Sequence, residues 1–350
     1  MKKILFALLA ATMLIGCQEK KDNNVIQIGV IAPLTGYASL PGEMCIKGLE
    51  MAKLDKDLKF EYVIADCKSS TKDAIAAYRN LYNKGIRYYI VCGGQFAMAI
   101  APQTKDKDVI MFATATANLD LLDVTNRCFR MFPHPNQIIE NLIDFSQEKF
   151  PSKDVAIIYL QNDAYAHYAN LYEEKIKAGG SNVVMKEGYA ATQNDFKSII
   201  AKVTMGKPNY IYLSSMGESI LTLTKQLLTD PRTSDIPVIG DMNYSLPNAK
   251  MIIPKTKTPI FYIDANIDNN FVKEYHKMFQ QAPNAYSYYA YTIPYILNDV
   301  LKNTDYQIAT QLDYIKKTDF KIASQLISFD NKGEVNLPLK YTRYINHSFC

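Results

Sequence analysis

Tryptophan is absent from this sequence, and histidine occurs only four times, at scattered positions. No HExxH, GxSxG, Walker-type or GxGxxG pattern is present, and no two cysteines stand in CxxC spacing. These absences remove the usual signatures of zinc proteases, serine hydrolases, nucleotide-binding enzymes and structural zinc sites. We therefore expect no enzyme activity, no catalytic residue, no metal site and no cofactor.

A strong excess of one charge is also missing. The 39 Lys and Arg residues against 35 Asp and Glu residues give a net charge of +4, and removal of residues 1–16 would lower it to +2. Such a balance does not imply a nucleic-acid partner. The hydrophobic content of 48% is that of a globular protein. The chain is longer than one hydrophobic core usually serves, so we expect two lobes.

The N-terminal apolar run is too short for a membrane span. It extends from Ile4 to Ile15, whereas crossing a bilayer takes about 20 residues. Met1-Lys2-Lys3 supplies a positive start and Gly16 a small residue near the end. This order is typical of a secretory signal peptide and disfavours the alternative of a short transmembrane anchor.

Leu14-Ile15-Gly16-Cys17 resembles a bacterial lipobox. The resemblance implies that the chain is cleaved before Cys17 and that this cysteine receives lipid, which would hold an exported protein at a membrane. The polar residues that follow suit a flexible tether. We expect residues 1–16 to be the signal peptide and residues 17–24 the lipid-anchored tether, with the protein in the periplasm or at the cell surface.

Short apolar runs alternate with segments of helical spacing through most of the chain. Most of the runs are continuously apolar, as in strands buried on both faces of a parallel sheet. Strand followed by helix, repeated, predicts an α/β doubly wound architecture. Strands are expected at 25–32, 60–65, 88–92, 109–112, 155–160, 182–185, 210–213, 236–239, 259–263, 326–329 and 340–346, and helices at 43–54, 71–84, 138–149, 164–178, 195–203, 219–228, 270–280, 286–302 and 308–316.

Proline-containing breaks interrupt the alternation twice, at Phe132–Pro135 and at Pro254–Pro259. Proline stops helices and central strands, so each break suits a crossover between lobes. The expected domains are residues 25–132 plus 264–325 for the first lobe and residues 133–263 plus 326–350 for the second.

Several short motifs stand in a distinctive order and spacing: Ile28–Gly36, Gly42, Gly48, Phe112–Asn118, Asp195-Phe196 and Ser328–Gly333. Together they resemble the type I solute-binding proteins of ABC importers, in particular the leucine/isoleucine/valine-binding group. The resemblance implies two lobes of mainly parallel sheet flanked by helices, joined by three crossovers near 132–135, 257–263 and 323–329. It also implies a monomer that captures an amino acid or similar small carboxylate by hinge closure and delivers it to an ABC permease.

The first-lobe ligand residues are expected in loops after two strands, because open parallel sheets bind ligands beyond the carboxyl ends of their strands. Gly93, Gly94 and Gln95 follow one strand and open a helix, whose amides favour a carboxylate. The resemblance places these residues at the family's carboxylate cradle. The resemblance also assigns ligand contacts to Thr114 and Thr116, for which helix capping is the alternative role.

The second lobe is expected to contribute Tyr165 as an aromatic lid, Ser215 after a strand, and Asp241. In relatives an acid in the last of these loops meets the ligand's ammonium group. That acid aligns with Met242 here, one residue beyond Asp241. Tyr37 stands near the position of the family's first-loop aromatic residue.

A disulfide between Cys67 and Cys92 is implied by the resemblance, since branched-chain relatives carry one at such positions. The alternative is two free buried thiols. Cys45, Cys128 and Cys350 have no family partner and are left unassigned. As an alternative function, a lipoprotein of the same fold could sense a solute or regulate a partner in the envelope without any role in transport.

Overall fold

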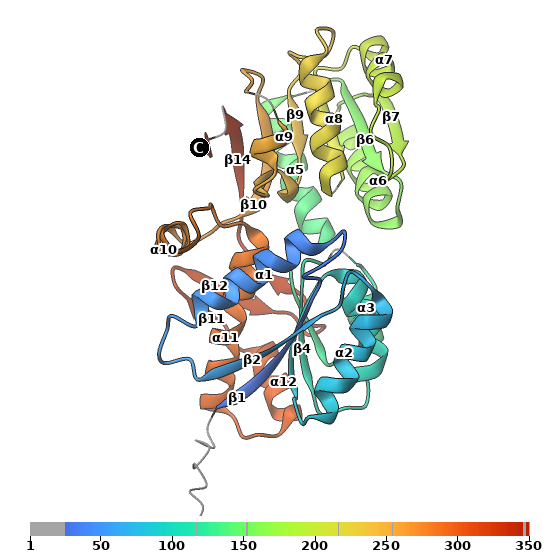
Figure 1. The fold of residues 1–350 in the computed structure, drawn as a ribbon. Helices are drawn as coiled ribbons and strands as arrows, with labels where there is room; N and C mark the ends of the chain where they lie inside the picture. Colours follow the sequence, from blue (N-terminus) through green and yellow to red (C-terminus); the bar gives the residue numbers. More distant parts are fainter. Residues whose placement is uncertain are drawn as a thin grey trace, which may run out of the picture.

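The computed structural model describes residues 25–116, 118–151, 153–215, 217–253, 255–345 and 348–349. The expected signal peptide, the lipidation site Cys17, the tether and Cys350 lie outside these residues. Two α/β lobes stack one above the other, with the start of the described chain at the bottom of the first lobe (Figure 1). Within the described part, no helix combines the length and apolarity that a membrane crossing needs.

The first lobe is built on a five-stranded parallel sheet in the order β2-β1-β3-β4-β5. Strands β3 and β4 are buried along their whole length, because helices cover both faces of the sheet. This is the reason for their continuously apolar sequences. The elements are β1 (Ile26–Ala32), α1 (Ser39–Ala52), β2 (Phe60–Asp66), α2 (Thr71–Asn83), β3 (Tyr88–Cys92), α3 (Gly94–Thr104), β4 (Ile110–Thr114), α4 (Leu121–Val124) and β5 (Cys128–Met131).

The second lobe holds a seven-stranded sheet in the order β15-β14-β10-β9-β8-β6-β7. Its strands from β6 to β10 run parallel, and β14 adds an antiparallel edge to β10. The elements are α5 (Pro135–Lys149), β6 (Val155–Leu160), α6 (Asp163–Ala178), β7 (Val183–Tyr189), α7 (Lys197–Gly206), β8 (Tyr210–Ser214), α8 (Gly217–Thr229), β9 (Val238–Gly240), η1 (Met242–Ser245), α9 (Ala249–Ile252), β10 (Ile260–Ala265), β14 (Leu339–Ile345) and β15 (Ser348–Phe349).

Between β10 and β14 the chain returns to the first lobe, where helix α11 packs closely on α1. A side chain at Gly48 would meet the Ser287 carbonyl oxygen at 2.0 Å, so only glycine allows this approach. The returning segment ends in a small antiparallel sheet, β11-β12-β13. The elements are α10 (Asn269–Phe279), α11 (Ala285–Asn303), α12 (Ile308–Lys317), β11 (Phe320–Ile322), β12 (Gln325–Phe329) and β13 (Val335–Asn336).

Three crossovers join the lobes, and two of them lie later in the chain than expected. The first is at Phe132–Pro135. The second follows β10, because all six residues of this strand are buried in the second sheet between β9 and β14. The third lies between β13 and β14, because β12 pairs with β11 and Arg130 of β5 bridges Glu334 next to β13. Residues 326–336 therefore sit with the first lobe.

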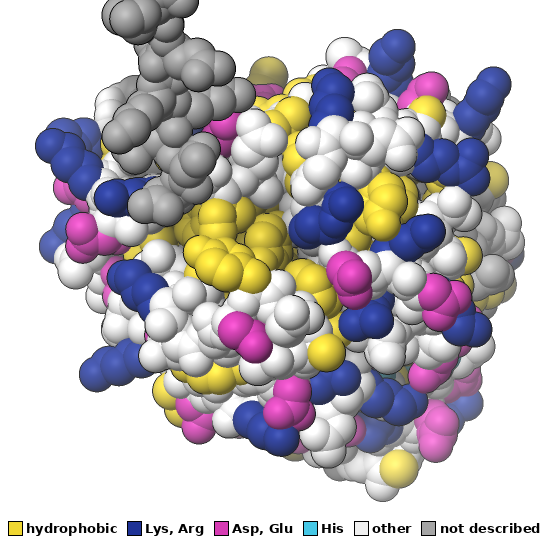
Figure 2. Space-filling view, turned by 90° about the horizontal axis from the view of Figure 1, so that it is seen from below, with side chains coloured by type: hydrophobic (Ala, Val, Ile, Leu, Met, Phe, Trp, Pro, Cys, Tyr) yellow, Lys and Arg dark blue, Asp and Glu magenta, His cyan; other side chains and the backbone are white. Residues whose placement is uncertain are grey.

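The face of the first lobe seen from below carries basic and acidic side chains side by side (Figure 2). An apolar area lies near the middle of this view, with charged residues around it. The basic side chains on this face form no continuous surface, because acidic ones lie between them.

Candidate functional site

The loops after β3 and β4 lie against each other at the carboxyl edge of the first sheet. The Gly93 N–H donates to the Thr114 carbonyl at 2.9 Å and the Gly94 N–H to the Ala115 carbonyl at 3.1 Å. Gly93 has a φ of 107°, and a Cβ at Gly94 would stand 2.6 Å from Oγ1 of Thr116. Gly94 and Thr116 are thus in direct contact, and glycine makes that contact possible.

These bonds change which amides are available to a ligand. The N–H groups of Gly93 and Gly94 are occupied by protein carbonyls, and those of Phe96 and Ala97 donate to the Gly93 carbonyl. A helix start leaves its first N–H groups without helical partners. Among the described residues, the Gln95 N–H is the donor of the first turn of α3 for which no acceptor is found. The Gln95 side chain donates to the hydroxyl of Tyr37, which is exposed.

The two threonines of the second loop differ in position. The Thr114 side chain is buried, and its hydroxyl donates to Sγ of Cys92 at 3.2 Å. It therefore faces the interior of the first lobe. Oγ1 of Thr116 adjoins Gly94 and accepts the Asn118 N–H at 3.4 Å. Ala115 between them has a φ of 52°, a conformation that costs free energy for a residue other than glycine and that is often found at functional sites.

The expected Cys67–Cys92 disulfide is wrong: the structure pairs Cys92 with Cys45 of α1, across a Cα–Cα distance of 6.8 Å. Cys67 is buried and free. Successive side chains of a strand point to opposite faces. Cys92 packs with Ile90 on the face toward α1, whereas Cys67 belongs with Val91 to the core on the other face. The sequence spacing correctly placed Cys67 and Cys92 at one edge of the sheet. It did not show that their side chains point to opposite faces of the sheet.

Arg130 holds the loop after β4, which contains Thr116 and Asn118, and the sequence did not predict this role. Its side chain is fully buried, and Nη1 donates to the Thr116 carbonyl at 3.2 Å while Nη2 donates to that of Asn118. Nε lies 2.8 Å from a carboxylate oxygen of Glu334. The only sequence signal is a charged residue inside the apolar run 128–132.

In the second lobe, Asp241 occupies a buried position at the end of β9. Oδ1 accepts the Asn243 N–H and the Asn243 side-chain amide, and the same amide nitrogen donates to the Ser215 carbonyl at 3.0 Å. Burial raises the pKa of Asp241 to about 7, against the lowering effect of the Asn243 and Ser215 hydrogen bonds. Asp241 and Ser215, both expected site residues, are thus joined through Asn243.

Six tyrosines surround Asp241 closely enough for its charge to affect them. Burial raises the pKa of each hydroxyl, and the nearby carboxylate raises it further. Tyr286 is on α11 of the first lobe, so this shell includes both lobes. Tyr168 also lies within electrostatic reach of Arg130, which holds the Thr116 loop. The six are Tyr165, Tyr168, Tyr189, Tyr212, Tyr244 and Tyr286.

We call the group formed by Gly94, Gln95, Thr116, Tyr165 and Asp241 the interlobe site. The first three residues belong to the first lobe and provide a helix start and a hydroxyl, and the last two belong to the second lobe and provide an aromatic ring and a carboxylate. Such a set of groups can hold a carboxylate and an ammonium group at once. In the described part of the chain, no three His, Cys, Asp or Glu side chains are placed to share a metal ion.

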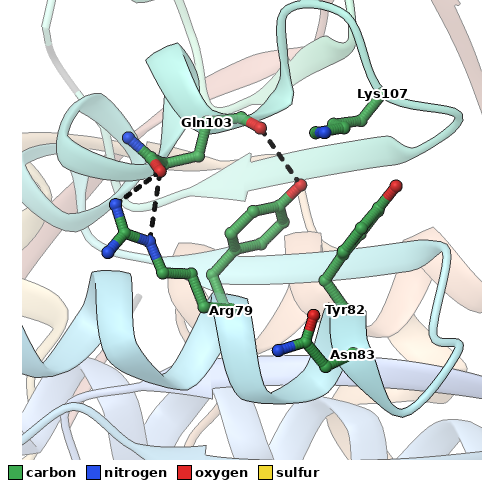
Figure 3. Close-up of a pocket in the computed structure, with 6 residues that line it drawn as sticks. Arg79, Tyr82, Asn83, Gln103 and Lys107 are labelled. Atoms are coloured by element: carbon green, nitrogen blue, oxygen red, sulfur yellow. Dashed lines mark hydrogen bonds between the residues drawn. The ribbon is translucent and has the colours of Figure 1, made fainter.

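A separate hollow of about 290 Å³ opens on the outer side of the first lobe, between α2 and α3 (Figure 3). Arg79 donates twice to Oε1 of Gln103, and the Tyr78 hydroxyl points to the Gln103 carbonyl. Because these donors are engaged with Gln103, the hollow is a packing feature between two helices.

Comparison with known proteins agrees with this architecture. A family model described as periplasmic binding protein matches residues 25–318. The Leu/Ile/Val-binding protein homolog 2 of Brucella abortus is 24% identical over 363 aligned residues, which cover 96% of this chain and 94% of the relative.

Two solved structures are similar in fold. LivJ of Streptococcus pneumoniae, a branched-chain amino acid substrate-binding protein in complex with isoleucine, has a TM-score of 0.81 and 16% identity, covering 93% of this chain and 97% of its own. A solute-binding protein of R. palustris in complex with benzoate has a TM-score of 0.79 and 16% identity, covering 93% and 95%. These relatives are transport proteins, not enzymes. The chain has the two-lobed type I fold of these structures, its motif order resembles that of the branched-chain amino-acid-binding group, and it belongs to the periplasmic binding protein family.

Proposed function

We propose that this chain is the lipid-anchored solute-binding protein of an ABC importer, which captures an amino acid between its lobes and delivers it to a permease. The family match and the names of the relatives support the solute-binding role. The lipobox-like Leu14–Cys17 supports export and attachment to a membrane through Cys17.

The single observation that supports an amino acid as the ligand is that the candidate residues of the two lobes have opposite polarities. The Gln95 N–H at the start of α3 and the Thr116 hydroxyl face a carboxylate, while Asp241 within its tyrosine shell receives the ammonium. An aromatic acid such as benzoate, which the R. palustris relative binds, has no ammonium to meet Asp241.

In this proposal each lobe holds one end of the solute, so the solute favours the closed arrangement over the open one. Tyr165 contributes apolar surface beside Asp241, and Tyr37 with Gln95 lies at the exposed edge. Ser215 acts through its carbonyl, which holds Asn243, whereas Thr114 supports the disulfide and the loop from within the first lobe.

A thermal-shift screen of the processed protein over the common amino acids, benzoate and hydroxybenzoate tests the proposal. A ligand at 100 times its dissociation constant should add about 2.7 kcal/mol to the free energy of unfolding. Thr116→Ala should weaken the best hit by about tenfold or more. Thr104→Val, which removes a buried hydroxyl from the far end of α3, is the matched control and should leave affinity unchanged. An unaltered affinity in Thr116→Ala would show that the site is wrongly assigned.

A further inference from the structure

One hydroxyl in the shell around Asp241 lacks a hydrogen-bond partner. The Tyr168 side chain is 4% exposed, and its hydroxyl oxygen is buried without a partner among the described residues. Four other hydroxyls of the shell do have side-chain partners. These pairs are Tyr165 with Asn243, Tyr189 with Ser215, Tyr212 with Ser214, and Tyr244 with Thr224.

An unpaired hydroxyl in this position calls for an explanation. A buried polar group without a partner opposes folding, and the great majority of such groups are therefore satisfied. Tyr168 could have been phenylalanine at no loss of apolar packing, because its ring already contacts Tyr165 edge-on at a centroid distance of 5.8 Å. The hydroxyl is the part of the side chain that packing does not use.

Tyr168 lies beside residues of the interlobe site, because its ring contacts Tyr165 and its hydroxyl is within electrostatic range of Asp241. Tyr165 and Tyr168 are three residues apart on α6 and so lie on the same face of the helix. The charges that act on Tyr168 come from Asp241 in the second lobe and Arg130 in the first. Arg130 in turn donates to the carbonyl of Thr116. The hydroxyl is thus within electrostatic range of Asp241 in the second lobe and of the arginine that holds the Thr116 loop in the first.

We propose that Tyr168 determines specificity: its hydroxyl pairs with a neutral polar group, an amide or a hydroxyl, at the end of the solute's side chain. The inference rests on the proposed function, because it extends the same site. The neutral character follows from the flanking charges. A second carboxylate would approach Asp241, and a second ammonium would approach the guanidinium of Arg130. The solute is then a polar amino acid of the asparagine, glutamine, serine or threonine kind.

Isosteric ligand pairs test this assignment on the full processed chain. Asparagine and leucine are close in shape, as are threonine and valine, and each pair differs in its polar end group. Calorimetry should show the polar member binding more tightly by about tenfold or more, since a site built for a hydrogen bond rejects an analogue that lacks it. Aspartate and glutamate should bind more weakly than their amides.

The variant Tyr168→Phe should remove most of this preference while keeping the affinity for leucine and valine. It should melt no lower than the parent protein without ligand, because it loses an unpaired buried hydroxyl. Tyr288→Phe is the matched control: it removes another buried hydroxyl, on the side of α11 that packs against Phe271. This control should leave the ratio of affinities unchanged.

Three outcomes overturn the inference. Leucine or valine could bind as tightly as its polar counterpart, or Tyr168→Phe could leave the ratio of affinities as it was, which would indicate a buried water at the hydroxyl. In either case amino-acid binding itself would stand. If no amino acid binds at all, the proposed function falls together with the inference, and the screen distinguishes that result from the first two.

Discussion

Oδ1 of Asp241 accepts hydrogen bonds from both nitrogens of Asn243, at 3.0 Å from the backbone and 2.7 Å from the side chain. These bonds favour the charged carboxylate, yet burial prevails and raises the pKa of Asp241 to about 7. A ligand ammonium needs the charged form, so binding must release a proton below neutral pH. We expect the dissociation constant to fall by up to about tenfold per pH unit from pH 5 to 7 and to level off above.

Calorimetry across this pH range measures the effect. Asp241→Asn should weaken the ligand and abolish its pH dependence. Asp264→Asn is the matched control, because burial raises the pKa of Asp264 to about 7 as well, but its hydrogen bonds go to the Ala265 N–H, Ser245 and Ala285 rather than to Asn243 and Ser215. A pH profile that is the same in parent protein and Asp241→Asn would contradict the role given to Asp241.

The same carboxyl predicts an opposite trend for the ligand-free protein. Its pKa is raised on folding, so the folded state binds the proton more tightly than the unfolded state does. The free energy of unfolding should therefore decline as the pH rises from about 4 to 7, by at most about 4 kcal/mol from this group. At pH 8, Asp241→Asn should have its unfolding midpoint at a higher urea concentration than the parent protein. At pH 4 the two midpoints should be similar. Equal midpoints for Asp241→Asn and the parent protein at pH 8 would contradict a buried charge at Asp241.

We expect Cys45–Cys92 to be the one native disulfide among the described residues. Peptide mapping of the unreduced protein should link these two cysteines and find Cys67 and Cys128 as thiols. Reduction removes a crosslink over 47 residues, which lowers the free energy of unfolding by about 4 kcal/mol in the chain-entropy model. Cys67→Ser should leave the Cys45–Cys92 disulfide intact. If this variant lacked a disulfide, the result would favour the Cys67–Cys92 pairing that the sequence predicted.

Gly94→Ala should disrupt the first-lobe half of the interlobe site. The new Cβ would lie 2.6 Å from Oγ1 of Thr116, so the hydroxyl must move. Ligand affinity should fall by about tenfold or more while the fold persists, because the clash involves a side chain. Gly206→Ala is the control: its Cβ would meet Val184 at an ordinary 3.4 Å, in the last turn of α7. Parallel losses in both variants would point to general destabilisation instead.

The buried Arg130 gives a prediction about loop order. Arg130→Met should destabilise the fold by about 3–5 kcal/mol, because Glu334 and two carbonyls lose their partner. Hydrogen exchange should rise first at Thr116 and Asn118, whose carbonyls it holds. Exchange that rises evenly over the first lobe would assign Arg130 to stability alone.

The buried strands were the most predictable part of the fold. The apolar runs at 88–92 and 155–160 coincide with β3 and β6, because helices cover both faces of each sheet. The sequence did not predict the short strand β5, because Arg130 interrupts its apolar run. In the structure the Arg130 side chain is buried, and its Nη1 and Nη2 atoms donate hydrogen bonds. Hinge positions were displaced because proline-rich stretches mark a loop but do not tell which lobe receives the next strand.

The sequence predicted which loops carry the candidate site residues, but it did not predict the hydrogen bonds that these residues form. Strand ends gave Gly94, Thr116 and Asp241, because ligand loops follow parallel strands. The engagement of the Gly93 and Gly94 amides and the inward turn of Thr114 depend on how two loops pack. Tyr168 gave no signal, since its spacing from Tyr165 is also that of ordinary helix packing.

The backbone N–H of Asn266 donates to the carbonyl of Pro338 at 3.1 Å, which links the second crossover to the third. Two of the three connections are therefore one paired ribbon. We expect such a ribbon to twist and flex as a unit and to resist shear along its length, which would let the two halves of the molecule rotate about one axis without sliding past each other. Capture of a solute would then follow a single, reproducible trajectory, with the interlobe site meeting in register at its end.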